Sequence, residues 1–388
     1  MKKKILFITT SRADYGQCKN LLLHLQSCKK IKFNLIVSGT HLLESYGKTI
    51  NEIYNDKITV SKKINIFESI NKRNVTNDID ISNAAFNKFK NIFKKMNPDY
   101  LIIFGDRFEM LPIAYLAYLN RTKIIHINGG EVTMGAIDES IRHSITKLSD
   151  YHFVSNDLNK KRIMAMGENK KNIYNFGSLG VDTVNKLIFF SKSKVEKDLK
   201  IKLGKKNLVL TFHPETYFKK NISKTLKKIL NEIKKLSDIK LFITAPNFDS
   251  GSENIRKVLL DFCKKNKNFY FIKSLGIKYY ISLVNLSDGV IGNSSSGIIE
   301  VPTLKKGTIN IGDRQKGRSR SKSIIDCKLD VKEILYSIKK LYSLNFQKKL
   351  KLTKNVYEKK NSSKKIFNQI LEITRIKEYK YKEFFIYD

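Results

Sequence analysis

The segment VIGNSSSGIIEVP, residues 290–302, joins an apolar strand to a predicted helix through a loop of small and hydroxyl-bearing residues. Such strand–loop–helix steps build parallel sheets covered by helices. Small residues let backbone N–H groups approach a ligand closely, and a helix start attracts anions. The segment therefore indicates a site for a nucleotide's phosphates and ribose, or a helix N-cap in which Ser294 to Ser296 satisfy backbone amides. The candidate ligands are Asn293, Ser294, Ser295, Ser296, Gly297 and Glu300.

The same alternation of short apolar runs and amphipathic segments extends over the whole chain. Predicted strands of the first half are residues 5–10, 33–38, 100–104, 123–127, 151–154 and 173–176, with helical stretches at 17–28, 81–96 and 139–148. Predicted strands of the second half are residues 208–212, 240–244, 269–272, 289–291 and 308–311. This pattern predicts an α/β protein with two doubly wound, Rossmann-like domains and an active site in the cleft between them.

We expect the domains to be residues 1–180 and 181–361, joined near the Lys-rich stretch 181–204. The first domain carries the candidate catalytic acids and the second the nucleotide site. A C-terminal helix within about 362–388 is expected to pack back on the first domain. A length of 388 residues with 41% hydrophobic residues is sufficient for two cores.

Composition narrows the class of protein further. No apolar run reaches the roughly 18–20 residues that span a bilayer, and the N-terminus is predicted to be a strand. We therefore expect a cytoplasmic protein without membrane partners. The four cysteines have no metal-binding spacing, so no metal site and no disulfide framework are expected.

The net charge of +38 raises the alternative of a nucleic-acid-binding protein. Only 11 of the 74 basic residues are arginines, and the lysines are spread along the chain rather than interleaved with aromatic residues. Solvated lysine faces are our main interpretation, so we expect no nucleic-acid partner. The positive field should still speed the capture of anionic substrates at low salt.

Charged residues follow several predicted strands of the first half. Arg12 lies after the first strand and could bind a phosphate or, with Asp14, cap the next helix. Asp106 ends the strand 100–104 and could be a catalytic acid or base whose charge Arg107 holds. The alternative for this pair is a strand-end salt bridge.

The next candidates lie after the strand 123–127. Glu131 ends the run HINGGE, in which the glycines allow a tight turn against a ligand. Asp138 and Arg142 are one helical turn apart, and His143 is either part of the same cluster or structural. Carboxylates on separate strand-end loops could converge on one sugar and perform acid–base chemistry.

In the second half, His213 follows a predicted strand and could neutralise a leaving phosphate. Arg314 follows what we predict to be the last strand, in the run GDRQKGR. It could bind pyrophosphate or belong to a solvated loop. No G-x-G-x-x-G motif follows the first predicted strand, so a dinucleotide cofactor is not supported.

Taken in order, these motifs resemble the hydrolysing UDP-N-acetylglucosamine 2-epimerases of bacterial sialic and legionaminic acid synthesis. The resemblance covers residues 5–327 through GDR, HxxGGE, DESIRH, FHPET, GNSSSGIIEVP and INIGDRQKGR. It implies a GT-B-like fold, no cofactor, and conversion of UDP-N-acetylglucosamine and water to N-acetylmannosamine and UDP through a 2-acetamidoglucal. It also implies that Asp106, Glu131, Asp138 and His213 are catalytic and that Glu300 binds ribose.

One position departs from the family pattern. Many members have Glu where this chain has Asn128, and asparagine cannot carry a proton. Either Glu131 or His126 takes that role, or this subfamily uses a different acid.

Several alternatives stay open on sequence grounds. The nearest is the same chemistry on GDP-N,N'-diacetylbacillosamine. Others are a non-hydrolysing epimerase, a GT-B glycosyltransferase and a basic nucleic-acid-binding protein. We expect a homo-oligomer with a UDP- or GDP-linked sugar as its substrate.

Overall fold

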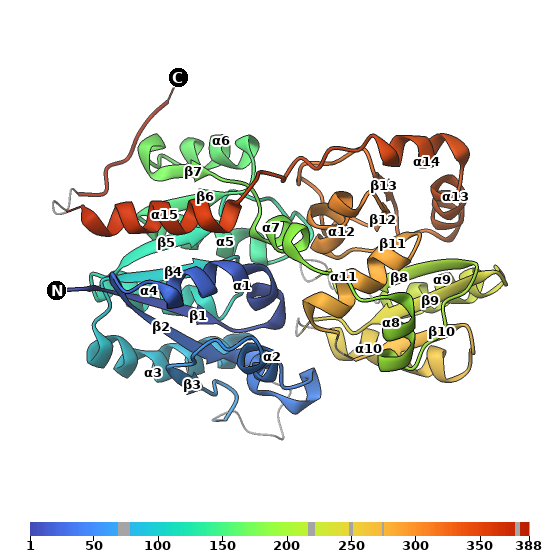
Figure 1. The fold of residues 1–388 in the computed structure, drawn as a ribbon, viewed down its shortest axis with the longest axis horizontal. Coiled ribbons are helices and arrows are strands. Elements are labelled where there is room, and N and C mark those ends of the chain that lie inside the picture. Colours follow the sequence, from blue (N-terminus) through green and yellow to red (C-terminus); the bar gives the residue numbers. More distant parts are fainter. Residues whose placement is uncertain (69–77, 216–221, 248–250, 274, 377–380, 388) are drawn as a thin grey trace. The chain divides into compact units, whose positions relative to one another are not determined.

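The computed structural model describes residues 1–68, 78–215, 222–247, 251–273, 275–376 and 381–387. It divides into two compact units, which are described separately (Figure 1). Unit 1 comprises Met1–Glu131, Asp138–Thr183 and Tyr357–Asp388, and unit 2 comprises Val132–Ile137 and Val184–Val356. The last residue of the FHPET motif and part of the predicted C-terminal segment lie outside the described residues.

Unit 1 is built on a parallel sheet of seven strands in the order β3-β2-β1-β4-β5-β6-β7. The strands are β1 (Lys3–Thr9), β2 (Ile31–Ser38), β3 (Lys62–Ile64), β4 (Tyr100–Phe104), β5 (Lys123–Ile127), β6 (Tyr151–Val154) and β7 (Ile173–Asn175). The main helices are α1 (Arg12–Ser27), α2 (Ile50–Asn55), α3 (Asp78–Met96), α4 (Met110–Leu119), α5 (Asp138–Leu148), α6 (Asp157–Ala165) and α15 (Ser362–Arg375). The strand order reverses direction between β1 and β4, which is where doubly wound sheets place their ligands.

Unit 2 has a parallel sheet of six strands in the order β10-β9-β8-β11-β12-β13. The strands are β8 (Lys206–Thr211), β9 (Ile239–Thr244), β10 (Phe269–Ile272), β11 (Gly289–Gly292), β12 (Gly307–Ile311) and β13 (Ile324–Cys327). Its helices are α8 (Lys192–Leu199), α9 (Ile222–Lys234), α10 (Ser252–Lys264), α11 (Gly276–Leu286), α12 (Ser295–Ile299), α13 (Val331–Leu341) and α14 (Leu344–Lys351). The helix α7 (Leu179–Lys186) contains the chain position at which unit 1 passes into unit 2.

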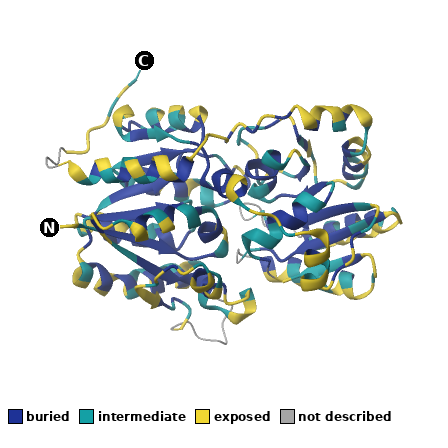
Figure 2. Cartoon of the chain, viewed as in Figure 1, coloured by how far each residue is buried: buried dark blue, intermediate teal, exposed yellow. Residues whose placement is uncertain are grey.

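Burial explains why these segments form these elements. All five residues of β4 are buried, as expected for a parallel strand covered on both faces (Figure 2). The helix α9 instead buries one stripe, Ile222, Leu226, Ile229, Leu230 and Ile233, at helical spacing. The prediction of an α/β fold with two doubly wound, Rossmann-like units is therefore confirmed.

Three local expectations need correction. The helix predicted at 17–28 begins earlier, because α1 starts at Arg12: Asp14 accepts hydrogen bonds from the amides of Thr10 (2.9 Å) and Ser11 (3.0 Å) and caps the helix. The strand 308–311 is not the last one, since β13 pairs beyond it. The edge strand β3 also escaped prediction, because two of its three residues are exposed lysines.

The C-terminal part of the chain belongs to unit 1. The helix α15 packs on α1, and the ring of Phe367 stacks on His24. Further along, the amide of Phe385 donates to the carbonyl of Gly167 (3.0 Å). Among the described helices, none combines the length and the apolarity needed to cross a bilayer.

Candidate functional site

The first group of candidate residues lies at the carboxyl ends of three adjacent strands of unit 1. Arg12 follows β1, Asp106 follows β4, and Glu131 closes the turn after β5. In that turn Gly130 has a φ of +73°, and a Cβ there would lie 2.5 Å from the carbonyl oxygen of Asn159. Only glycine therefore fits this close approach.

Arg142 of α5 is the centre of this group. Its side chain is 1% exposed, its Nη2 forms an ion pair with Asp106, and its Nη1 donates to the carbonyl of Glu131 (2.7 Å) and to the Glu139 carboxylate (3.0 Å). Burial alone lowers the pKa of Arg142, but the charges of Asp106, Glu131 and Glu139 outweigh it and raise the pKa. The guanidinium stays charged and holds the Asp106 carboxylate in place.

Arg107 was expected to hold the charge of Asp106. In the structure Arg142 forms the ion pair with Asp106, while Arg107 donates from Nε to Glu109 (3.1 Å). The reason is reach across the fold: α5 brings a side chain 36 residues away onto the end of β4. Sequence proximity did not point to Arg142 as a partner of Asp106.

The other predicted acids differ in their surroundings. Glu131 is 3% exposed, and its Oε1 accepts a hydrogen bond from Ser155 Oγ (3.1 Å). Asp138 is half-buried at the first position of α5. His143 pairs through Nε2 with Glu139 Oε1 (3.0 Å).

Glu139 and Ser155 were missed in the sequence. The spacing of Glu139 three and four residues before Arg142 and His143 was the available signal for the first. No local signal pointed to Ser155.

The two candidates to replace the family's glutamate at Asn128 can now be compared. His126 is completely buried, and both ring nitrogens are engaged, Nε2 with the carbonyl of Gly105 (2.8 Å) and Nδ1 with Thr146 Oγ1 (3.1 Å). Burial lowers the pKa of His126 to about 3. A shielded, neutral imidazole with both nitrogens occupied cannot exchange protons with a substrate, so the suggestion that His126 takes this role is wrong.

Arg12 is the first residue of α1, whose cap is made by Ser11 and Asp14. The alternative that this segment caps a helix is therefore realised, but by Asp14 rather than by Arg12. The positive charge of Arg12 acts on Glu52, whose pKa is raised by burial and lowered in part by Arg12.

The second group lies in unit 2, at the ends of the neighbouring strands β8 and β11. The amide of His213 donates to Asn293 Oδ1 (2.7 Å), and Asn293 Nδ2 donates back to the carbonyl of His213 (2.8 Å). The Nδ1 atom of His213 accepts from the amide of Asn247 (3.2 Å). In the neutral ring the proton is therefore on Nε2, which makes that atom a donor.

The loop after β11 begins α12. Ser294 is the N-cap and accepts from the amide of Ser296 (3.3 Å), so the capping interpretation holds for this hydroxyl. Gly297 is packed so closely that a Cβ would lie 2.7 Å from the methyl group of Thr308. Ser295 is the first residue of α12, and Glu300, 4% exposed, is the residue after its last turn.

Arg314 contacts the same loop. Its Nη1 donates to the carbonyl of Asn293 (3.2 Å), and Gln315 Nε2 donates to the same oxygen (2.9 Å). Glu215, in the segment after β8, supports this arrangement, because its Oε1 accepts from the amide of Asp313 (3.0 Å). Gln315 and Glu215 were not predicted, although both lie inside the recognised motifs.

Residues 132–137 belong to unit 2 although their neighbours in sequence belong to unit 1, which the sequence did not suggest. They lie between Glu131 and Asp138 of unit 1 but group with unit 2. The amide of Met134 donates to the carbonyl of Lys316 (3.3 Å), and a Cβ on Gly135 would lie 2.9 Å from Cα of Arg314. The segment joining two candidate acids thus packs on the loop that carries Arg314.

Within the described part of the chain, no group of three or more His, Cys, Asp or Glu side chains is arranged to hold a metal ion. The chemistry that these residues can perform is acid–base catalysis by carboxylates in unit 1 and anion binding by amides, His213 and Arg314 in unit 2.

Several known proteins are similar to this chain. A family model described as UDP-N-acetylglucosamine 2-epimerase matches residues 23–371. The chain is 38% identical to the GDP/UDP-N,N'-diacetylbacillosamine 2-epimerase (hydrolyzing) of Campylobacter jejuni, over 89% of each chain. It is 36% identical to the polysialic acid biosynthesis protein P7 of Escherichia coli, over 99% of this chain and 97% of that protein.

The fold has a solved counterpart. The crystal structure of UDP-GlcNAc 2-epimerase from Neisseria meningitidis bound to UDP-GlcNAc matches with a TM-score of 0.82 at 17% identity, covering 96% of this chain and all of the other. The likeness to this solved structure supports a GT-B-like fold. The matched family model supports common ancestry with that family. The chain therefore belongs to the UDP-N-acetylglucosamine 2-epimerase family.

Proposed function

We propose that this enzyme is a hydrolysing 2-epimerase that converts UDP-N-acetylglucosamine and water to N-acetylmannosamine and UDP, for nonulosonic acid biosynthesis. The observation that carries the proposal is the buried Arg142, which ties Asp106 to the same strand-end cluster as Glu131 and Glu139. Carboxylates gathered at strand ends are suited to moving protons at a sugar carbon. Kinship with proteins that carry "hydrolyzing" in their names supports the hydrolytic outcome.

In the first half-reaction a carboxylate removes the proton from C2 while the C1–O bond breaks, and its electrons leave with UDP. The product is 2-acetamidoglucal. We assign Asp106 to proton transfer at C2, because Arg142 fixes its carboxylate. The C2–H group is a weak acid, so stabilisation of the departing diphosphate must carry much of the barrier.

In the second half-reaction an acid protonates C2 from the opposite face, and water adds at C1. Asp138 is the candidate acid, since it is half-buried at the start of α5. The water places its hydroxyl group on C1 and its other proton on Asp138, and Asp106 releases the proton taken from C2 to solvent, so both carboxyl groups return to their starting states. Glu131 is assigned to the same machinery through its charge on Arg142 and its contact with Ser155.

Unit 2 is assigned to the nucleotide. His213 can donate from Nε2 to a phosphate oxygen, and the amides near Ser295 and Ser296 are suited to the same anion. Glu300 is assigned to the ribose hydroxyls and Arg314 to the phosphates, to which we also assign Arg12 of unit 1.

The experiment is an NMR time course of the full-length protein with UDP-N-acetylglucosamine in D₂O. We expect free N-acetylmannosamine and UDP in equal amounts, with deuterium at C2. Release of a nucleotide-linked mannosamine would instead mean a non-hydrolysing enzyme. Absence of both products would rule out this substrate.

A second substrate is favoured by one specific observation. The 38% identical relative from Campylobacter jejuni is called a GDP/UDP-N,N'-diacetylbacillosamine 2-epimerase (hydrolyzing). The same residues would perform the same chemistry on that sugar. Parallel assays with UDP-N-acetylglucosamine and with UDP- and GDP-linked diacetylbacillosamine, compared by kcat/KM, decide between the two.

A further inference from the structure

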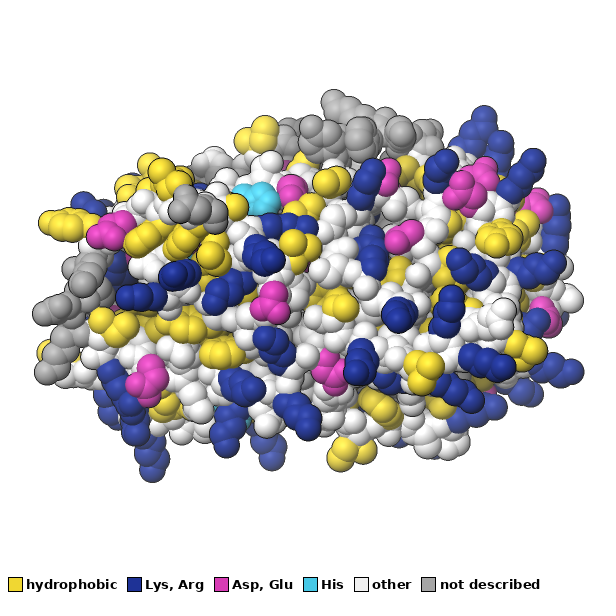
Figure 3. Space-filling view, turned by 90° about the horizontal axis from the view of Figure 1, so that it is seen from above, with side chains coloured by type: hydrophobic (Ala, Val, Ile, Leu, Met, Phe, Trp, Pro, Cys, Tyr) yellow, Lys and Arg dark blue, Asp and Glu magenta, His cyan; other side chains and the backbone are white. Residues whose placement is uncertain are grey.

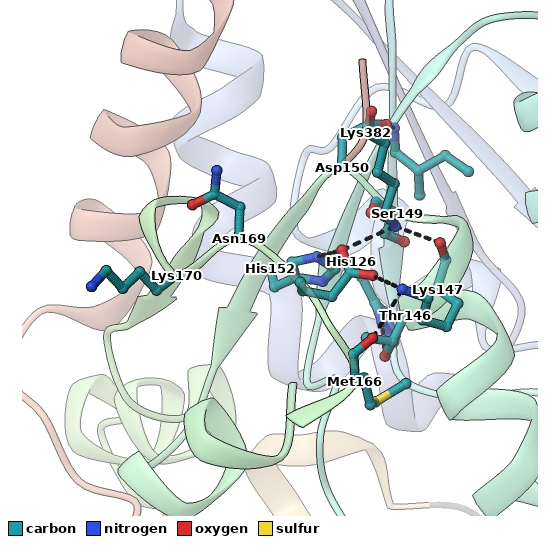
Figure 4. A network of polar contacts seen from close by, with 12 residues as sticks. His126, Thr146, Lys147, Ser149, Asp150, His152, Met166, Asn169, Lys170 and Lys382 are labelled. Carbon is teal, nitrogen blue, oxygen red and sulfur yellow. Dashed lines mark hydrogen bonds and ion pairs between the residues drawn. The ribbon is translucent and has the colours of Figure 1, made fainter. Parts of the chain in front are cut away.

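Two buried histidines lie side by side under α5. His126 on β5 and His152 on β6 are partners in the strand register, and both are completely buried (Figure 4). Their contacts differ. His152 donates from Nε2 to the Glu168 carboxylate (3.1 Å), whereas His126 contacts the carbonyl of Gly105 at the end of β4.

The hydrogen bonds of His126 determine its tautomer. A carbonyl oxygen only accepts, so the Nε2 atom that contacts Gly105 must carry the proton. A neutral imidazole has one ring proton, which leaves Nδ1 as an acceptor. The hydroxyl of Thr146 has one proton and two acceptors within reach, Nδ1 at 3.1 Å and the carbonyl of Arg142 at 3.0 Å.

These contacts fix the residue directly before Asp106. Gly105 has a φ of +76°, a conformation that few side chains adopt, and its carbonyl is oriented by His126 while its amide donates to the carbonyl of Ile127 (2.9 Å). The imidazole ring of His126 also lies close to Gly129, where a Cβ would lie 3.0 Å from Nδ1. The imidazole therefore packs directly against the turn that leads to Glu131.

The helix α5 thus reaches Asp106 by two routes. Arg142 holds the carboxylate itself, and Thr146, one turn further along, holds the backbone through His126. Asp138 begins the same helix. The distance between the two candidate acids therefore depends on both connections.

We propose that His126 is a positioning residue, which sets the backbone of Gly105 and through it the orientation of the Asp106 carboxylate. This inference rests on the proposed function, in which Asp106 transfers a proton at C2. His126 touches no substrate and exchanges no proton. Its contribution is geometric, and small displacements of a reacting group are known to cost about 10²-fold in rate.

The test compares four variants of the full-length enzyme. His126→Leu removes the donor to Gly105, and His126→Gln restores an amide donor on a side chain of similar reach. His152→Leu and His152→Gln are matched controls, because His152 is equally buried on the adjacent strand but contacts Glu168. For each we measure kcat, KM, the affinity for UDP, Tm and the pH profile of kcat.

We expect His126→Leu to lower kcat by about 10²-fold, with KM and UDP affinity within about threefold of wild type, and His126→Gln to recover most of the loss. The His152 variants should lower Tm and leave kcat within about threefold. A folded His126→Leu enzyme with near-normal kcat overturns the inference. An equal kcat loss in the His152 variants, or a limb of the pH profile that disappears in His126→Gln, overturns it as well.

A second readout does not depend on turnover. In protein labelled with ¹⁵N-histidine, the His126 resonances, assigned by their loss in His126→Gln, should show a neutral ring with the proton on Nε2 from pH 5 to pH 8. A proton on Nδ1, or titration within that range, overturns the inference. An inactive wild-type protein with the expected resonances would count against the proposed function while leaving the geometry of His126 supported.

Discussion

Asp106 and Arg142 illustrate how a single contact organises the candidate catalytic group. Burying a guanidinium costs several kcal/mol unless carboxylates and carbonyls surround it. Arg142 meets this requirement with Asp106, Glu139 and the carbonyl of Glu131. The same contacts that stabilise the buried charge keep the Asp106 carboxylate at one position, which is what a proton-transfer group needs.

Asp106→Asn and Asp138→Asn should each lower kcat by about 10²-fold or more, because an amide cannot accept or donate the proton at C2. The measurement is UDP release at saturating substrate. Asp150→Asn is the matched control: its carboxylate accepts from the amide of Ile124 (2.9 Å) at the opposite end of β5. Near-normal turnover in Asp106→Asn or Asp138→Asn would remove that residue from the mechanism.

Glu300→Gln should mainly raise KM, because a ribose contact is made equally in the ground and transition states. Glu300→Asp keeps the charge on a shorter side chain and should give an intermediate KM. Steady-state kinetics with the nucleotide sugar give both constants. A large kcat loss at unchanged KM would contradict the assignment of Glu300 to the ribose.

At the level of elements, α5 is held at both ends. Its N-terminal turn carries Asp138 and Glu139, and past its C-terminal end Lys382 donates to the carbonyl of Ser149 (2.6 Å). Lys382 and Lys147 both form ion pairs with Glu168 (3.0 and 2.6 Å). The C-terminal segment of the chain is thereby tied to the helix that orients the candidate acids (Figure 4).

Glu168→Gln should lower the free energy of unfolding by roughly 3 kcal/mol at pH 7, because it leaves two lysines beside a buried neutral group. Hydrogen bonds from His152 and Lys147 outweigh the effect of burial and lower the pKa of Glu168 to about 2. The contribution of the ionised Glu168 to the free energy of unfolding is therefore complete above pH 4.5 and is lost as the pH falls toward 2.

Urea unfolding at pH 7 and pH 3 tests this prediction. The control is Glu372→Gln, whose ion pair with Arg375 is exposed (58% for both side chains) and should contribute less than about 1 kcal/mol. Equal effects of the two substitutions would show that the Glu168 cluster does not stabilise unit 1.

On the scale of the whole molecule, buried histidines should make stability depend on pH. Burial lowers the pKa of His41 and His126 to about 3, and it also lowers the pKa of His152. Below pH 6.5 the unfolded chain binds protons that the folded protein cannot, so unfolding becomes easier as the pH falls toward 3. Each such histidine costs about 1.4 kcal/mol per pH unit in this range.

Thermal unfolding between pH 7 and pH 4 measures this slope. His41→Gln should flatten it by the equivalent of one proton, since Gln does not titrate. His41 contacts Thr9 (3.0 Å) and Thr49 (2.8 Å), away from the residues assigned to catalysis. An unchanged slope in His41→Gln would mean that this histidine does not resist protonation in the folded state.

The net charge of +38 should also make the thermal stability of the protein depend on salt concentration. Figure 3 shows lysines and arginines over the whole face drawn, interspersed with few acids. Like charges on a folded surface repel, and salt screens them over about 10 Å at 0.1 M. Raising NaCl from about 0.02 to 0.3 M should therefore raise Tm by a few degrees. A neutral osmolyte at equal osmolarity is the control, and a Tm that falls with salt would contradict the prediction.

The sequence by itself determined where the strands lie and where polar residues follow them. Residues 100–104, 123–127, 151–154 and 269–272 are strands with the predicted bounds, because the strands of a parallel sheet covered by helices are continuous apolar runs. Motif order was enough to identify the family. These properties depend on neighbours along the chain and can be read from it.

Only the tertiary structure decided which side chains meet. It paired Asp106 with Arg142 rather than with Arg107, buried His126 against Gly105, and grouped residues 132–137 with unit 2. These contacts join residues that are distant in sequence or depend on which way a side chain turns. Their physical reason is the shared burial of charged and polar groups at neighbouring strand ends, where each must find a partner that the local sequence does not contain.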